Sequence, residues 1–86
     1  MSYAILMQRR AQKKLQSLPR NDRVRIAEKI SQLGNNPDDP TLDKKSLAGV
    51  PLYRLRVGEW RIIYNRQDAV RVIAIEKIKA RGDAYK

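Results

Sequence analysis

The stretch Leu52-Tyr-Arg-Leu-Arg-Val-Gly-Glu-Trp-Arg-Ile-Ile-Tyr64 decides the fold of this chain. Apolar and charged residues alternate through two segments of it, which Gly58-Glu59 separates. A glycine in the first position of a two-residue turn is typical of a type II′ hairpin. The turn therefore predicts a pairing register in which Arg56 lies directly opposite Arg61.

The predicted hairpin has two faces of opposite character. Because side chains alternate along a strand, one face collects the apolar residues and belongs to the core: Tyr53, Leu55, Val57, Trp60, Ile62 and Tyr64. The other face carries Arg54, Arg56 and Arg61. Like charges placed opposite each other destabilise a sheet. We therefore expect an anionic ligand between these arginines, with a merely solvated sheet face as the alternative.

The composition restricts the class of protein. The chain has 86 residues and a formal net charge of +10, which favours one domain over residues 1–86 with an anionic partner: nucleic acid, an acidic protein or a membrane surface. No apolar run approaches the ~20 residues of a membrane span, and the first residues lack the charge order of a signal peptide. Without cysteine or histidine, the chain has neither disulfides nor the usual metal ligands and general acid–base residue. We expect a cytoplasmic protein that uses no membrane, metal or small-molecule cofactor.

Two helices joined by a tight turn are predicted before the hairpin. Helical spacing of apolar residues begins at Arg9, and Pro19 ends this first helix. Asn21 or Asp22 is the expected cap of the second helix, which the turn residues 34–37 terminate. Two apolar stripes are possible on the second helix, namely Val24, Ala27, Ile30 and Leu33, or Ile26 and Ile30.

The remaining segments predict an α+β fold. Residues 3–7 are a short apolar strand, and residues 44–49 lead into the hairpin. Residues 66–68 form a turn, and residues 69–77 are the most apolar strand, expected inside the sheet. The order is β-α-α-β-β-β: a small, mostly antiparallel sheet with a two-helix hairpin packed on its apolar face. The arginine face stays open.

The open face is predicted to be a groove that binds RNA. Lys79, Arg81 and Tyr85 lie beyond the end of the last predicted strand, and a tail that folds back adds them to the arginines. Arginine binds phosphate through paired hydrogen bonds, and aromatic rings stack on unpaired bases.

Such a groove could also cleave RNA without a metal. Cleavage needs a deprotonated 2′-hydroxyl, stabilised charge on the phosphate and a protonated leaving oxygen. The arginines meet the second need. Lys79 among like charges is a candidate base, and Tyr85 can donate or relay a proton.

The hairpin motif resembles the core signature of the RelE/ParE superfamily of bacterial and archaeal toxins. The family's common form is Leu-x-Gly, a few residues, then Tyr-Arg-[Leu/Ile]-Arg-x-Gly-[Asp/Glu]-[Trp/Tyr]-Arg-[Ile/Leu]-x-Tyr. Residues 47–64 read Leu-Ala-Gly-Val-Pro-Leu-Tyr-Arg-Leu-Arg-Val-Gly-Glu-Trp-Arg-Ile-Ile-Tyr. The basic ending with Asp83-Ala84-Tyr85 is similar to the family's terminus, and the length and element order agree with it.

The resemblance implies a RelE-like fold and the function of a toxin in a toxin–antitoxin pair. RelE-like toxins are ribosome-dependent endoribonucleases that cut mRNA in the A site through attack of the 2′-hydroxyl. A cognate RelB-like antitoxin neutralises them, so the implied partners are antitoxin, ribosome and mRNA. Position by position, the resemblance implies a catalytic set of Arg54, Arg56, Arg61, Lys79, Arg81 and Tyr85.

Within this implied set, Arg61 contacts the scissile phosphate and Tyr85 stacks on or orients the nucleotide. The chain departs from its relatives at Lys79, where some have arginine, and it lacks the His-Arg pair of others. The branch that uses a Glu–His pair is therefore excluded. Glu76, expected at a strand end beside Lys77, is interpreted as a salt-bridge partner rather than a base.

Other basic residues are candidates for contact with RNA or the ribosome. Lys44 and Lys45 fit loop solubility and RNA-backbone contact equally well. A solvated helix face is favoured over a ribosome or antitoxin contact for the basic residues of the first helix, namely Arg9, Arg10, Lys13 and Lys14.

Three functions remain open. The first is a ribosome-dependent mRNA endonuclease toxin, which basic residues at the catalytic positions and Tyr85 favour. The second is a toxin of the ParE branch, which blocks DNA gyrase and needs no catalytic set. The third is a basic RNA- or ribosome-binding module.

Overall fold

The computed structural model describes residues 2–80. Its elements, in chain order, are β1 (Ala4–Met7), α1 (Arg9–Ser17), α2 (Arg20–Asn35), β2 (Lys44–Ser46), β3 (Tyr53–Val57), β4 (Trp60–Gln67) and β5 (Val72–Ala80). Arg81 and Tyr85, two of the predicted site residues, lie outside the described part of the chain. No helix within residues 2–80 has the length and apolar character needed to cross a membrane.

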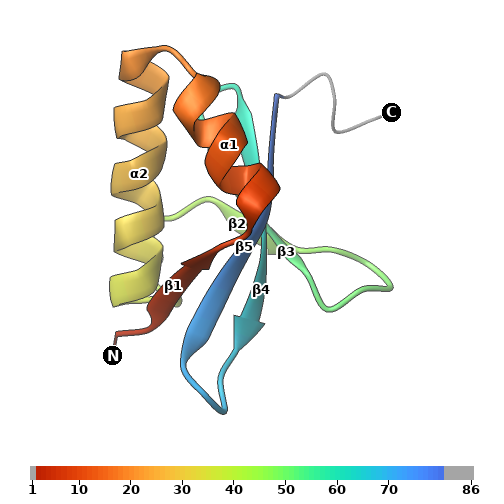
Figure 1. Cartoon of the computed structure of the whole chain (residues 1–86). Helices are drawn as coiled ribbons and strands as arrows, with labels where there is room; N and C mark the ends of the chain where they lie inside the picture. Colours follow the sequence, from red (N-terminus) through yellow and green to blue (C-terminus); the bar gives the residue numbers. More distant parts are fainter. Residues whose placement is uncertain (1, 81–86) are drawn as a thin grey trace.

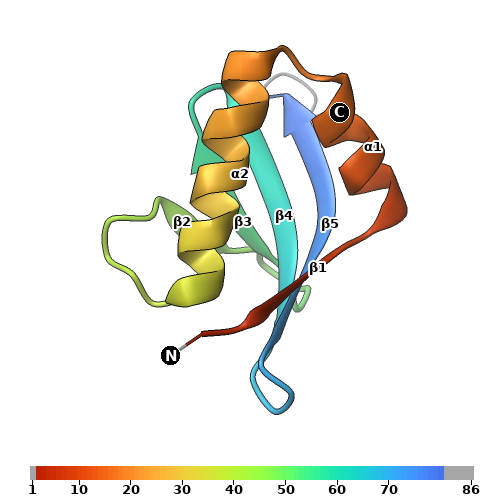
Figure 2. The same ribbon diagram turned by 60° about the vertical axis from the view of Figure 1, so that its left-hand side comes forward.

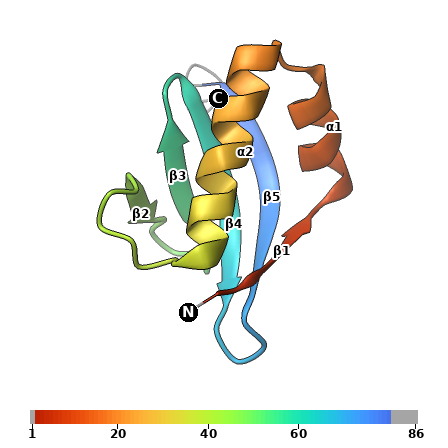
Figure 3. The ribbon, with the colours of Figure 1, turned by 90° about the vertical axis from the view of Figure 1, so that its left-hand side faces the viewer.

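The strands form one five-stranded sheet in the order β1-β5-β4-β3-β2 (Figure 1). Strand β1 runs parallel to β5, and every other neighbouring pair is antiparallel. Both helices pack on the same face: α2 lies across the middle strands and α1 lies beside β5 (Figures 2 and 3). This arrangement confirms the predicted α+β fold with a helical hairpin on one face.

The central hairpin has the predicted register. Arg56 pairs with Arg61, and Gly58 has a φ of 58°, a left-handed conformation that glycine adopts without steric cost. On the helix-facing side, Leu55, Ile62 and Ile78 form a buried row across β3, β4 and β5. The hydrophobic alternation and the turn therefore set the register together.

A β-bulge interrupts the pairing of β4 with β5. Ile63 pairs with Lys77 and Tyr64 pairs with Ile75, so Glu76 is the extra residue on β5. The bulge changes the phase of the strand, which allows both Ile75 and Ile78 to be buried although an odd number of residues separates them. The sequence analysis did not predict this irregularity.

Helix α2 differs from the prediction at its start. It begins at Arg20, and Pro19 precedes its first turn in place of the predicted Asn21 or Asp22 cap. Proline suits this position because its missing N–H has no helical partner to satisfy there. Asp22 instead lies within the first turn, where a negative charge complements the helix dipole.

The buried face of α2 is the second of the two predicted stripes. Ile26 and Ile30 are buried, together with Leu33, whereas Val24 is 46% exposed. Gly34 also faces inward, because a Cβ atom there would approach the Ile5 side chain of β1 to 3.0 Å. The small residue lets α2 lie close to the edge strand.

Two other boundaries correct the sequence prediction. Residues 44–46, expected as a lead-in, form β2 and pair with β3 at the edge of the sheet. Strand β5 begins at Val72 rather than residue 69, because Asp68 to Arg71 form the turn and Arg71 has a φ of 53°. Val70 made this turn appear strand-like in sequence, yet it is 63% exposed.

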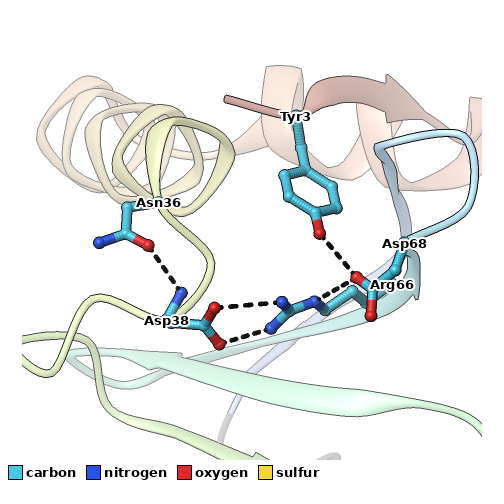
Figure 4. Close-up of polar contacts among 5 residues, drawn as sticks. All are labelled: Tyr3, Asn36, Asp38, Arg66 and Asp68. Carbon is cyan, nitrogen blue, oxygen red and sulfur yellow. Dashed lines mark hydrogen bonds and ion pairs between the residues drawn. The ribbon is translucent and has the colours of Figure 1, made fainter. Parts of the chain in front are cut away.

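Arg66 joins three distant parts of the chain, around Tyr3, Asp38 and Asp68 (Figure 4). Its Nη1 and Nη2 atoms donate to the Asp38 carboxylate at 2.8 and 3.2 Å, and its Nε donates to Asp68 Oδ1 at 2.6 Å. The Tyr3 hydroxyl donates to the same Asp68 oxygen at 2.8 Å, and the guanidinium lies 5.5 Å from the Tyr3 ring centroid. The network links the residue before β1, the end of β4 and two loops.

This network shifts the titration of its members. Hydrogen bonds from Arg66 hold the pKa values of the Asp38 and Asp68 carboxyls below their usual range, and both carboxylates raise the pKa of the Arg66 guanidinium. The ionised forms of these groups are therefore favoured in the folded protein.

The α2 face can be tested by a pair of substitutions. Ile26→Ala removes a fully buried side chain, and we expect it to lower the free energy of unfolding by about 2–5 kcal/mol. Val24→Ala, two residues away and half exposed, should change it by only about 0.5 kcal/mol. Urea unfolding followed by circular dichroism measures both, and equal losses would contradict the observed face.

The Arg66 network predicts a loss of stability in acid. Because the folded-state pKa values of Asp38 and Asp68 lie below their unfolded values, their stabilising contribution is present near neutral pH and disappears as the pH falls through the folded values. We expect Tm to fall less steeply from about pH 6 to pH 2 in Arg66→Gln than in the wild-type protein. Arg23→Gln, an exposed α2 change, is the control.

We expect the Tm of Arg66→Gln still to fall somewhat at acidic pH. Hydrogen bonds from Thr41 also lower the pKa of Asp39, and this contribution does not depend on Arg66. Identical profiles for Arg66→Gln and the wild-type protein would show that the network does not control acid stability.

Candidate functional site

A row of three cations crosses the open face of the sheet. Arg56 of β3 pairs with Arg61 of β4, which pairs in turn with Lys79 of β5. All three side chains are partly exposed. Lys79 therefore lies inside β5, and not beyond its end as the sequence analysis expected. The row presents three positive charges to whatever occupies this face.

A groove of about 410 Å³ lies over this face, lined by residues from α1, three strands and the loop between β2 and β3. Its lining is Arg10, Leu47, Leu52, Arg54, Arg61, Ile63, Glu76, Lys77 and Lys79. The β2–β3 loop extends from the sheet on the side away from α2, and it contributes the two leucines as a wall (Figure 1). The groove thus combines apolar surface with a ring of cations.

The arginines of β3 are held in place by short-range contacts. Arg54 Nη2 lies 3.3 Å from Asp43 Oδ1, and the Arg54 side chain is only 18% exposed. Its Nε atom is buried and has no hydrogen-bond partner among residues 2–80. Arg56 Nε donates to the Gly58 carbonyl at 3.4 Å. These contacts position donor groups that an anionic ligand could use.

A second basic groove of about 380 Å³ continues from the first toward α1. Its lining is Arg10, Lys14, Lys77, Ile78 and Lys79, so three of its residues belong to both grooves. Lys14 Nζ lies 5.8 Å from the Trp60 ring centroid, at the distance of a cation–π contact. Trp60 itself packs against the core, which agrees with its predicted role.

The basic residues of α1 differ in their position relative to the two grooves. Arg10 lines both grooves, whereas Arg9 and Lys13 are exposed on α1 and line neither. Lys14, which was considered with them in the sequence, lines the second groove. The way α1 packs beside β5 therefore places Lys14 at the second groove and leaves the neighbouring Lys13 outside it.

Lys44 and Lys45 do not line the arginine groove. They line a third hollow of about 260 Å³, together with Tyr53, Tyr64 and Arg66. The two tyrosine rings stack with centroids 5.4 Å apart, and burial raises the pKa of Tyr64 to about 12. Lys45 is nevertheless the cross-strand partner of Arg54, one of the predicted catalytic residues, whereas Lys44 pairs with the buried Leu55.

Two charged residues of the groove were missed or misread in the sequence. Lys77 lines the groove, and Glu76 is the one carboxylate among the lining residues in the described chain. Within residues 2–80, Glu76 forms no ion pair, so it is not the predicted salt-bridge partner of Lys77. The change of phase from Ile75 to Ile78 was the sequence signal for the bulge that places both residues here.

The described part of the chain contains no cluster of side chains that could bind a metal ion. No three acidic side chains within residues 2–80 gather as a cation would require. What the site offers is positive charge, hydrogen-bond donors, one carboxylate and an apolar wall. This combination suits a phosphodiester with an attached base.

Comparison with known proteins places the chain in a family. Residues 5–85 match the model of the family described as "ParE toxin of type II toxin-antitoxin system, parDE". The curated "Putative toxin RelE1" of Methanocaldococcus jannaschii is 34% identical over 88 residues, covering 100% of this chain and 98% of that protein.

Solved structures agree with this assignment. The RelE chain of the archaeal RelE–RelB complex from Pyrococcus horikoshii is 35% identical, with a TM-score of 0.83 over 95% of this chain and 98% of its own. The RelB–RelE complex from Methanococcus jannaschii contains a chain that is 27% identical, with a TM-score of 0.77 over 93% and 94% of the two chains. With a matching family model over nearly its whole length and a relative above 30% identity, the chain belongs to the RelE/ParE superfamily of toxins of type II toxin–antitoxin systems.

Proposed function

We propose that this toxin is a ribosome-dependent endoribonuclease that cuts mRNA in the A site without a metal. The observation that carries the proposal is the row Arg56–Arg61–Lys79, in which three cations lie side by side and two of them, Arg61 and Lys79, line the groove. Such a row is unfavourable without an anion, and a scissile phosphate is an anion whose charge increases during cleavage. The resemblance of the hairpin motif to RelE-like toxins supports the same reading.

The proposed catalytic set is Arg54, Arg56, Arg61, Lys79, Arg81 and Tyr85. Arg54 and Arg61 line the groove with Lys79, and Arg56 extends the row toward the hairpin turn. Arg81 and Tyr85 follow β5 in sequence, and their roles rest on the family resemblance alone. Preorganised cations stabilise the developing charge on phosphorus, which is usually the largest single contribution to such catalysis.

The remaining basic residues are proposed contacts with the ribosome or the RNA backbone. Arg10 is the best supported, because it lines both basic grooves. Arg9, Lys13, Lys44 and Lys45 do not line the arginine groove, although Lys45 pairs with the groove residue Arg54.

A cognate antitoxin of the RelB type is the proposed protein partner. Two archaeal relatives, at 35% and 27% identity, were solved as RelE–RelB complexes. A formal net charge of +10 favours an acidic partner, which would cover the basic face of the toxin.

Inhibition of DNA gyrase is the second candidate function. The matching family model is described as the ParE toxin of parDE, which supports this alternative. A gyrase inhibitor needs a binding surface but no groove arranged around a phosphate. A basic RNA- or ribosome-binding module without catalysis is the third reading.

Removal of the central cations tests the nuclease. We expect Arg56→Ala, Arg61→Ala and Arg81→Ala together to reduce cleavage at least about 1,000-fold, because each charge-stabilising donor is typically worth 100- to 1,000-fold. Primer extension on a reporter mRNA in a purified translation system measures the cuts. Discrete cuts within A-site codons that depend on ribosomes are the expected wild-type result.

A matched control removes the same charge elsewhere. Arg20→Ala, Arg23→Ala and Arg71→Asn also delete three exposed cations, and this variant should cleave like the wild-type protein. Intact mRNA with the wild-type toxin, together with loss of gyrase supercoiling activity, would replace the nuclease with the second candidate. No effect in either assay would favour the binding module.

Arg61→Ala should leave the fold nearly unchanged. The substitution relieves repulsion with Arg56 and Lys79, so we expect the free energy of unfolding to change by less than about 1 kcal/mol. Ile62→Ala, at the next residue but on the buried face, should cost about 2–5 kcal/mol. Urea unfolding compares the two, and a large loss in Arg61→Ala would contradict the assignment of this face.

A further inference from the structure

The β-bulge aims a carboxylate into the cationic groove. Glu76 and Lys77 together oppose Ile63 on β4, and paired residues of a bulge direct their side chains to roughly the same side of the sheet. Both of them line the groove with Ile63. In a regular strand, a residue next to Lys77 would instead point toward the helices. The irregularity is therefore what gives the groove an acidic group.

The helix and each of the three strands that line the groove contribute at least one cation to it. Helix α1 contributes Arg10, β3 contributes Arg54, β4 contributes Arg61, and β5 contributes Lys77 and Lys79. No second acidic residue from the described chain lines the groove. Among the groove-lining residues of the described chain, the Glu76 carboxylate is therefore the one acidic side chain that can act as a proton acceptor.

A structural role for Glu76 has little support in its contacts. The three ion pairs within residues 2–80 use Asp38, Asp43 and Asp68, each of which binds an arginine. Glu76 forms none there, although five cationic residues line the same groove. A carboxylate that is placed among cations yet not bound to one is available to a ligand.

We infer that Glu76 is the general base of the cleavage reaction, a catalytic residue that takes the proton of the attacking 2′-hydroxyl. This inference rests on the proposed nuclease function and names the group that the sequence analysis left to Lys79. A carboxylate is ionised near neutral pH and needs no neighbouring charge to make it basic, whereas an ammonium group must first lose its proton.

The reaction balances with groups that the site and solvent supply. The Glu76 carboxylate takes the 2′-hydroxyl proton as the 2′-oxygen forms a bond to phosphorus, and the bond from phosphorus to the 5′-oxygen breaks. The Lys79 ammonium donates a proton to the leaving 5′-oxygen. The products are a 2′,3′-cyclic phosphate and a 5′-hydroxyl, after which Lys79 regains a proton and Glu76 loses one by exchange with solvent.

If Glu76 is the general base, its removal should affect the cleavage rate and the substrate affinity differently. As the one acidic residue from the described chain that lines the basic groove, Glu76 repels the phosphate of the substrate, so its removal should not weaken binding. A general base typically contributes 100- to 10,000-fold to the rate. Loss of the base should therefore slow the chemical step while substrate affinity stays the same or increases.

The experiment compares Glu76→Gln with the wild-type toxin in single-turnover cleavage of mRNA on programmed ribosomes. We expect the maximal rate to fall at least about 100-fold, with a half-saturating toxin concentration that does not rise. Glu59→Gln, at the exposed hairpin turn, removes the same charge and should cleave at the wild-type rate. Tm of each variant, from circular dichroism, should equal that of the wild-type toxin.

Chemical rescue separates a base from a structural group. In Glu76→Ala, sodium formate should restore cleavage at least about tenfold over sodium chloride at equal ionic strength, because formate can replace the missing carboxylate as a proton acceptor. Cleavage by Glu76→Gln within about threefold of wild type would overturn the assignment. So would a loss that formate does not reverse and that accompanies a lower Tm or weaker ribosome binding. Wild-type toxin that leaves mRNA intact would instead overturn the proposed nuclease itself, and the base with it.

Discussion

Burial of one face of the hairpin strands is the interaction on which the rest of the structure depends, because it holds Arg56, Arg61 and Lys79 side by side on the opposite face. Leu55, Ile62 and Ile78 form the neighbouring cross-strand row and are buried under the helices. Burying one such side chain stabilises the fold by about 1.5–3 kcal/mol. Two solvated like charges about 5 Å apart repel each other by only about 1 kcal/mol. The core therefore outweighs the repulsion, and the cations stay together without a ligand.

The bulge at Glu76 reconciles two patterns that a regular strand cannot satisfy at once. The first half of β5 places Ile73 and Ile75 in the core, whereas the second half must place Ile78 there so that Lys79 can join the cation row. One extra residue moves the alternation by one position. The same residue is the only one in β5 that brings negative charge to the open face, so the irregularity contributes to packing and to the site.

The sequence predicts those features that depend on local alternation. The hairpin register, the two helices and the open arginine face follow from the spacing around Gly58 and the apolar periods, and the structure confirms them. The bulge and the start of β5 were missed because an interior strand is apolar on both faces, which hides a change of phase. The choice between Ile26 and Val24 on α2 depends on how the helix docks. The Arg66 network joins residues as far apart as Tyr3 and Asp68, and no local pattern announces such a contact.

The distribution of acidic residues explains why the groove keeps its charge. The chain has nine acidic residues, and Asp38 and Asp68 are bound to Arg66 at the far end of β4. Arg66 lies five residues beyond Arg61, or roughly 17 Å along the strand, which exceeds the screening length of about 8 Å at physiological salt. Those carboxylates consequently stabilise the fold without neutralising the cation row. The segregation leaves one end of the sheet with paired charges and the other with a basic groove, whose lining within residues 2–80 includes the single carboxylate of Glu76.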